Sequence, residues 1–159
     1  DYQIRQIITA GYWCLTNKFT KMKQITEEQA IALIKEFQNQ NLISLDLNEA
    51  EIYTFHAQME GREFAFLCEA SINEAHSEDS NRIAKLLEIL KPEIDSLNKS
   101  PRYFQIQILF SQDAMLMMEE MNALNDCLDS YEDIEIKWSL NSVENETNYV
   151  KMQIITITE

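Results

Sequence analysis

The sequence predicts an α+β domain with a mixed, mostly antiparallel sheet and helices packed on one face. Three segments, residues 103–110, 134–141 and 149–158, alternate between apolar and polar side chains as half-buried strands do. Residues 26–40 and 77–91 instead carry apolar side chains at the three-and-four spacing of amphipathic helices. Because the strands keep one polar side, we expect that face of the sheet to meet solvent or a partner.

The length, composition and net charge of the chain limit which classes of protein it can belong to. Hydrophobic residues make up 45% of the 159 residues, which suits one folded domain. No apolar run approaches the ~18–20 residues of a membrane-spanning helix, so we expect no membrane insertion. The net charge of -14 opposes contact with phosphate, so nucleic acid is not an expected partner. The same charge favours solubility, or attraction to a basic partner or a cation.

Neither the cysteines nor the histidines form a recognisable site. Cys14, Cys68 and Cys127 lie far apart and include no CxxC pair, which predicts buried reduced thiols and suits the cytoplasm. His56 and His76 follow no metal-ligand or catalytic spacing, so we expect structural or surface roles. With only 2 glycines in the chain, the phosphate-binding loops of nucleotide enzymes are excluded and no cofactor is expected.

Residues 1–25 are expected to form an N-terminal helix and a basic connector, ahead of a domain that covers residues 26–159. Residues 2–19 have apolar side chains at helical spacing, and the sequence KFTKMKQ that overlaps their end is rich in lysine. Thr26 predicts the start of the next helix. Its hydroxyl can cap the helix while Gln29 completes a capping box.

Two hairpins are expected in the rest of the chain. Residues 51–58 and 63–72 are rich in β-branched and aromatic side chains, and Gly61 lies in a turn between them. Residues 134–141 and 149–158 are separated by NSVENETN, which has no helical pattern. We therefore expect this last pair of strands to lie antiparallel as neighbours in the sheet.

Two helices are expected between the strands. Ser77 or Asp79 is a suitable N-cap for the first, because its short side chain can accept from the exposed backbone amides. Pro92 cannot continue a regular helix, so we expect this helix to end near Lys91. The second helix is expected over residues 113–128.

The second of these helices carries four methionines: Met115, Met117, Met118 and Met121. Flexible thioethers can fill gaps in a core or form an adaptable docking surface. Four methionines cover more than one face of a helix, so we expect core filling for most and exposure for at least one.

An acidic cluster stands before the first predicted hairpin, at Asp46, Glu49 and Glu51. Asp46 and Glu49 are three residues apart and would share one face of a short helix. Paired carboxylates can bind a cation or position a water molecule, although such clusters are more often solvated helix caps.

The order of elements from residue 103 to 158 resembles the C-terminal domain of FtsZ, the bacterial tubulin-like cell-division family. The resemblance rests on the strand YFQIQILF, the helix after SQD, the strand IEIKWSL with Trp138, the loop NSVENETN and a final strand. EFAFLCEASINEAHSEDSNRIAKLLEIL looks like the family's strand, turn and helix, which extends the likeness to residues 27–158. Glu69 and Ser111 stand near positions where the family has glycine, and its glycine-rich GTP-binding domain has no counterpart in this sequence.

The resemblance implies an assembly domain that works in the cytoplasm and has neither a cofactor nor an activity of its own. Such a domain would bind a protein partner or self-associate, as in polymerisation during cell division. The segment NLISLDLNEAEI looks like the loop whose acidic residues complete the GTPase site of a neighbouring subunit. That role would fall on Asp46 and Glu49, with Ser44 where an amide is usual. A second alignment makes residues 2–19 the central helix and gives these acidic residues no such role.

Two other classes of function stay open from the residues alone. The first is a regulatory module that binds a small ligand, because helices over a mixed sheet support many such domains. The second is a cation-dependent enzyme built on Asp46 and Glu49.

Overall fold

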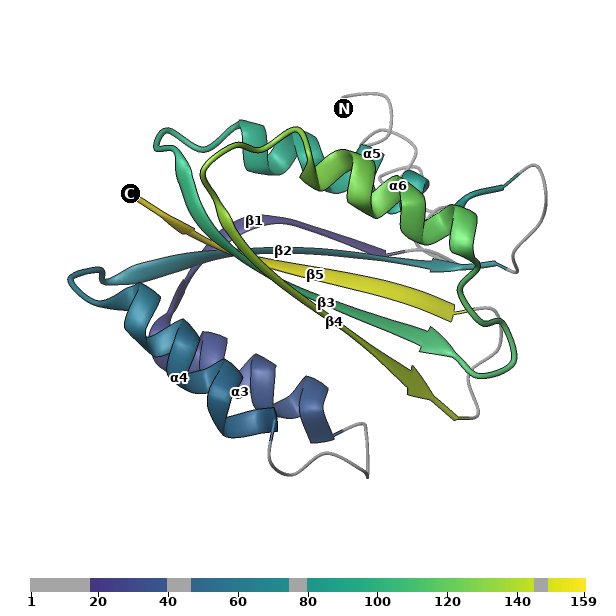
Figure 1. The fold of residues 1–159 in the computed structure, drawn as a ribbon, viewed down its shortest axis with the longest axis horizontal. Helices are drawn as coiled ribbons and strands as arrows, with labels where there is room; N and C mark the ends of the chain where they lie inside the picture. Colours follow the sequence, from purple (N-terminus) through teal and green to yellow (C-terminus); the bar gives the residue numbers. More distant parts are fainter. Residues whose placement is uncertain (1–17, 40–46, 75–79, 145–148) are drawn as a thin grey trace.

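The computed structural model describes residues 18–39, 47–74, 80–144 and 149–159. Within them, five strands form one sheet in the order β1-β2-β5-β3-β4 (Figure 1). In chain order the elements are β1 (Lys18–Thr26), α3 (Glu27–Asn39), α4 (Leu47–Met59), β2 (Phe64–Asn73), α5 (Arg82–Asp95), β3 (Pro101–Ser111), α6 (Met118–Leu128), β4 (Glu135–Val143) and β5 (Tyr149–Thr158). The predicted α+β class and its mixed, mostly antiparallel sheet are confirmed.

Strand β3 lies between β4 and β5. It pairs with β5 in antiparallel fashion and with β4 in parallel fashion, so Ile106 stands opposite both Ile154 and Trp138. The parallel pair is connected through α6, as parallel neighbours need a long crossover. The remaining contacts, β1 with β2 and β2 with β5, are antiparallel.

The expected hairpin of residues 134–141 with residues 149–158 is wrong, because β3 separates the two strands. Burial explains the arrangement. Residues 152–158 of β5 are buried without interruption, which requires neighbours on both sides and cover on both faces. Most of β4 is only half-buried or exposed, which fits a strand at the edge of the sheet. The short connecting loop favoured a hairpin, but β5 is buried on both faces and therefore lies in the middle of the sheet, next to β3 instead of β4.

Helices cover both faces of the sheet, where the sequence indicated one. α5 and α6 lie over one face, and α3 and α4 lie over the other (Figure 1). Alternate residues of β5 show the division. Met152 and Ile154 pack in the core with α5 and α6, whereas Ile155 and Ile157 pack with α3 and α4. The two hydrophobic cores therefore share the central strands as a common wall.

Helix α4 covers part of the second face, although a strand was expected in its segment. Residues 51–58 lie inside this helix. Phe55 and Met59 are buried and Ile52 packs beside them, while Tyr53 is 75% exposed. This is helical spacing that the β-branched and aromatic composition concealed. Gly61, at φ 80, forms the turn from α4 into β2 in a backbone conformation that glycine adopts without strain.

The predicted basic connector is also a strand. Residues Lys18–Thr26 form β1, which takes the place beside β2 that was expected for residues 51–58. Phe19 and Met22 pack against one core and Ile25 is buried in the other, so the lysines alternate with apolar side chains. The predicted helix at residues 2–19 lies outside the described residues, apart from its last two positions.

The polar side chains of the central strands form a buried row rather than a wet face. Gln107 Nε2 donates to Gln153 Oε1 at 2.9 Å, and Gln153 Nε2 donates to Glu69 Oε2 at 2.8 Å. At the edge, Asn141 Nδ2 donates to the carbonyl of Phe37 in α3 at 2.8 Å. The expectation of a solvated face is therefore wrong. The alternating polar side chains form hydrogen bonds beneath α3 and across β3, β5 and β2 instead.

The predicted N-cap is confirmed for α3 and is wrong for α5. At α3, the amide of Gln29 donates to Thr26 Oγ1 at 3.2 Å and the amide of Thr26 donates to Gln29 Oε1 at 2.9 Å, so the predicted capping box is confirmed. At α5 the cap is Asn81, whose Oδ1 accepts from the amide of Ala84 at 2.9 Å. Ser77 and Asp79 lie outside the described residues.

Two helix boundaries differ from expectation. α5 continues through Pro92 to Asp95, because proline in the last turn removes a single backbone hydrogen bond, and the amide of Ser96 donates to the carbonyl of Pro92 at 3.1 Å. α6 begins at Met118 instead of residue 113, because the preceding residues turn sharply after β3. There the amide of Asp113 donates to Ser111 Oγ at 3.1 Å.

Replacement of Asn81 by alanine should test the corrected cap of α5. We expect Asn81→Ala to lower the free energy of unfolding by about 1 kcal/mol, because the amide of Ala84 loses its acceptor. Urea unfolding measures the change. Asn122→Ala, at an exposed position of α6, is the matched control and should change stability little. An equal loss in both variants would contradict the capping role.

Candidate functional site

Only Glu49 and Glu51 of the acidic cluster singled out by the sequence lie within the described residues. Asp46 and Ser44 lie outside the described residues. Glu49 is exposed in the first turn of α4, and Glu51 accepts a hydrogen bond from Gln38 Nε2 of α3 at 2.9 Å. Glu51 thereby joins the two helices. The predicted role of Asp46 and Glu49 in a neighbouring GTPase site stays a prediction.

The described residues offer little for metal chemistry or membrane insertion. Among them, no three His, Cys, Asp or Glu side chains are grouped to hold a metal ion, and no helix is long and apolar enough to cross a membrane. His56 is exposed, with Nδ1 3.1 Å from each carboxylate oxygen of Glu27, so it links the ends of α3 and α4. His76 and Cys14 lie outside the described residues.

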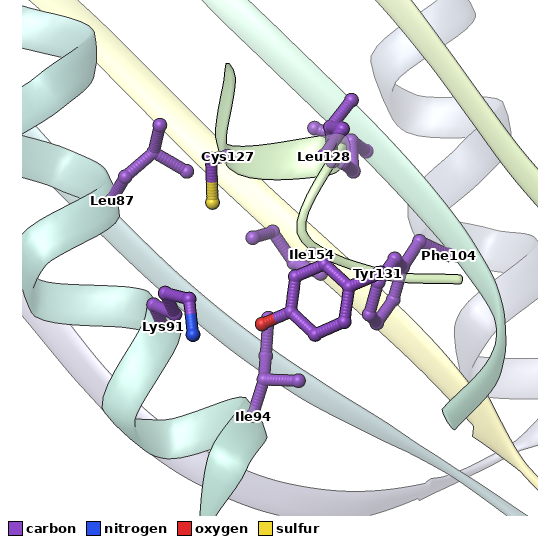
Figure 2. Close-up of a pocket in the computed structure, with 9 residues that line it drawn as sticks. Leu87, Lys91, Ile94, Phe104, Cys127, Leu128, Tyr131 and Ile154 are labelled. Carbon is purple, nitrogen blue, oxygen red and sulfur yellow. The ribbon is translucent and has the colours of Figure 1, made fainter. Parts of the chain in front are cut away.

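A small pocket lies between α5, α6 and the sheet (Figure 2). Its volume is about 10 Å³, which is room for roughly one water molecule. Its lining is almost wholly apolar, and consists of Leu87, Lys91, Ile94, Phe104, Ile106, Cys127, Leu128, Tyr131 and Ile154. Such a space is a packing gap, and it lends no support to the alternative of a small-ligand module.

Three polar side chains contact one another beside this pocket. Lys91 Nζ donates to Asp95 Oδ2 at 2.8 Å and lies 5.3 Å from the centre of the Tyr131 ring, whose hydroxyl donates to Asp95 at 3.2 Å. Burial raises the pKa of the Cys127 thiol, and Asp95 adds to the rise. Burial likewise raises the pKa of Cys68, the other thiol among the described residues. Both thiols are therefore protonated at neutral pH and poorly reactive. The predicted burial is confirmed for Cys68, whereas Cys127 is half-buried.

The described structure contains a fully buried ion pair, between Arg82 and Glu120. Both side chains are 0% exposed. Arg82 Nε and Nη2 donate to the two carboxylate oxygens of Glu120, each at 2.9 Å, in the two-pronged geometry that arginine favours. Arg82 is the first residue of α5 and Glu120 lies in the first turn of α6, so the pair joins the starts of both helices.

The remaining donors of Arg82 bind backbone carbonyls of two loops. Nη1 donates to Ala114 O at 3.0 Å and to Glu74 O at 3.3 Å, and Nη2 donates to Met115 O at 3.0 Å. Glu120 Oε1 in turn accepts from the amide of Met117 at 3.0 Å. We call Arg82, Glu120 and these backbone groups the arginine clamp. It fixes the connection from β3 to α6 from beneath.

Sequence reasoning did not mark this clamp. Glu120 lies 38 residues from Arg82, and the carbonyls of Ala114 and Met115 lie 32 and 33 residues away. The available signal was an arginine directly before the apolar stripe of a helix. A solvated helix end explains that pattern equally well, and only the fold brings the partners together.

Protonation of Glu120 is opposed by the clamp. Burial alone would raise the pKa of this carboxyl group, but the hydrogen bonds from Arg82 and the amide of Met117 outweigh burial and lower it. A carboxylate whose pKa is lower in the folded than in the unfolded chain stabilises the fold above the unfolded value. That contribution is lost as the pH falls through the lower, folded value.

The clamp supports a set of exposed apolar side chains. Met115, Met117 and Met118 are 62%, 44% and 74% exposed. Met121, one turn further along α6, is half-buried and packs against the core. The prediction that at least one methionine of this segment reaches the surface is confirmed. The expected core filling is wrong for three of the four, and these exposed methionines stand at and before the start of α6.

The two edges of the sheet differ in their protection. β1 has a register shift between Thr20 and Lys23 and carries the exposed Lys21 and Lys23, which are features that discourage another strand from pairing. β4 pairs with β3 in an unbroken register over residues 135–143. Its Trp138 is 44% exposed, and among the described strands none pairs with its outer side.

Comparisons with known proteins leave the family open. No family model matches the chain, and no curated protein matches it. Among solved structures, an FtsZ dimer from M. jannaschii is similar with a TM-score of 0.47 and 18% identity, over 72% of this chain and 31% of that one. Thiamine monophosphate kinase from Aquifex aeolicus is similar with a TM-score of 0.39 and 12% identity, over 58% of this chain and 34% of that one. This chain thus spans about a third of either neighbour, and its function has to come from its own residues.

Removal of one partner of the buried ion pair should destabilise the fold strongly. We expect Glu120→Ala to lower the free energy of unfolding by about 3–5 kcal/mol, because it leaves the Arg82 guanidinium buried without a counter-charge. The apolar pair Arg82→Met/Glu120→Leu should not recover the loss, because three carbonyls would still lack their donor. Lys85→Ala, which breaks the exposed ion pair with Glu74, is the control and should cost less than about 1 kcal/mol.

The same carboxylate should contribute to acid unfolding. The stabilising effect of Glu120 is complete well above its unfolded pKa of about 4.3, and it falls away below that value. We expect the stability difference between the native chain and Glu120→Gln to shrink between pH 7 and pH ~3. Urea unfolding at a series of pH values measures it, and a difference that is constant over this range would show that the carboxylate charge is not responsible.

Proposed function

We propose that this chain is an assembly domain that pairs with a second copy of itself through the outer edge of β4. The observation that supports the proposal is the contrast between the two edges of the sheet. β1 is broken in register and lined with lysine, whereas β4 is regular and carries a large exposed aromatic side chain. Natural sheets protect edges that must stay single, and because β4 lacks the register break of β1, its edge is suited to receiving a strand.

The side chains of β4 are complementary to their own copy. In an antiparallel pairing centred on Ile136, Glu135 of each copy stands opposite Lys137 of the other. Carried one residue beyond the start of β4, the same register places Ile134 opposite Trp138, an apolar and aromatic pair on the other face of the sheet. Two ion pairs and two apolar pairs then flank one symmetry axis.

This geometry determines the kind of assembly. A contact of the same strand with itself closes after two copies, so it gives a dimer with one continuous sheet. The net charge of -14 on each chain opposes association at long range, and salt screens this repulsion. We therefore expect a weak dimer that becomes tighter at moderate salt concentration.

Charge exchange in β4 tests the proposal. Sedimentation velocity over a wide range of concentrations should show a reversible dimer for the native chain. Glu135→Lys and Lys137→Glu should each weaken it by about tenfold or more, because each places like charges opposite one another twice. An equal mixture of the two variants should form a heterodimer, because every charged pair is then opposite in sign.

The double exchange Glu135→Lys/Lys137→Glu is the matched control, and it should restore the dimer because it reverses both members of each pair. Tyr53→Gln, at an exposed position of α4, should leave the dimer unchanged. A native chain that stays monomeric at every concentration and salt level would refute the proposal. A dimer that is indifferent to both charge reversals would place the contact elsewhere.

A further inference from the structure

We infer that Met115, Met117 and Met118 form a docking surface for a basic amphipathic helix of another protein. These three residues are called the methionine surface below. They belong to the connection from β3 and to the first turn of α6, whereas the proposed dimer contact is centred on Ile136 near the start of β4. The inference therefore goes beyond the proposed function and does not rest on it.

The methionine surface is held in place from beneath. The carbonyls of Ala114 and Met115 accept hydrogen bonds from Arg82, and the amide of Met117 donates to Glu120. Both side chains of that ion pair are fully buried, so the backbone beneath the methionines has a fixed position. The thioether side chains themselves stay adaptable, and a fixed base with flexible apolar contacts is suited to binding a partner.

The same hydrogen bonds decide the form of the partner. Backbone groups at residues 114, 115 and 117 are already engaged with the arginine clamp. An extended strand would need such groups for its own amides and carbonyls, whereas a helix satisfies its backbone internally. The methionine surface offers side chains instead, and these suit the apolar stripe of a helix.

The charge around the methionine surface determines the charge expected on the partner helix. Residues 111–136 contain eight Asp and Glu and no Lys or Arg. Asp113 and Glu119 are exposed beside the methionines, and the chain as a whole carries a net charge of -14. An apolar surface with an acidic border attracts a helix whose polar face is basic, and it repels acidic proteins and anionic lipid.

Methionine methyl spectra test the inference in solution. The full chain, labelled with ¹³C at its methionine methyl groups, is titrated with a helical peptide of about 18 residues that has Leu on one face and Lys on the other. We expect the signals of Met115, Met117 and Met118 to shift together. The buried Met59 and Met152 should stay in place.

Matched variants separate the methionine surface from general charge attraction. Met115→Gln/Met117→Gln/Met118→Gln changes only exposed side chains, so it should keep the melting temperature while weakening peptide binding by about tenfold or more. Tyr53→Gln removes an exposed apolar side chain elsewhere and should leave binding unchanged. A control peptide in which every Lys is replaced by Glu should not bind.

Each result decides for or against the inference. Undiminished binding by the triple variant, or equal binding of the acidic peptide, would overturn it. Shifts of the three signals on addition of phosphatidylcholine vesicles, with none on addition of the basic peptide, would assign the surface to lipid. Lys137→Glu, designed to disrupt the dimer, should bind the basic peptide like the native chain, so failure of the dimer and failure of this docking are told apart.

Discussion

The buried ion pair between Arg82 and Glu120 is the contact on which the layer of helices α5 and α6 depends. It joins the first turns of both helices, and its other donors hold the loops that lead into them from β2 and β3. A buried ion pair often contributes little net stability compared with an apolar pair of the same shape. Its main effect here is to fix positions. One guanidinium group holds the end of β2, the connection from β3 and the start of α6, which no backbone hydrogen bonds of a sheet join together.

The sequence allowed a correct prediction of the fold class, of the strand at residues 103–110 and of the cap at Thr26, because each depends on neighbours in sequence. The errors arose where the decisive contacts are distant. Phe55 and Met59 become a helix face only against the sheet, and β5 takes a central place because both of its faces are buried. Asn81 and Arg82 had no local pattern that separates them from an ordinary helix end, whereas the run of methionines was visible in the sequence but did not show which of them are exposed.

The two surfaces proposed for contact differ in what the backbone leaves available. At the outer side of β4, no described strand uses the amides and carbonyls, so an incoming chain can extend the sheet. At the start of α6 the backbone is engaged by Arg82 and Glu120, so only side chains can make contacts. The two proposals therefore assign chemically distinct partners to these surfaces, a strand at β4 and a helix at the start of α6.

The position of β5 in the sheet has a consequence for how the chain is made. Among the described strands β5 comes last in the sequence, yet it separates β1 and β2 on one side from β3 and β4 on the other. While the polypeptide leaves the ribosome, these two pairs cannot join until the residues of β5 follow. During that interval the inner edges of β2 and β3 stay open to wrong pairing, which exposes the nascent chain to aggregation until β5 pairs with both.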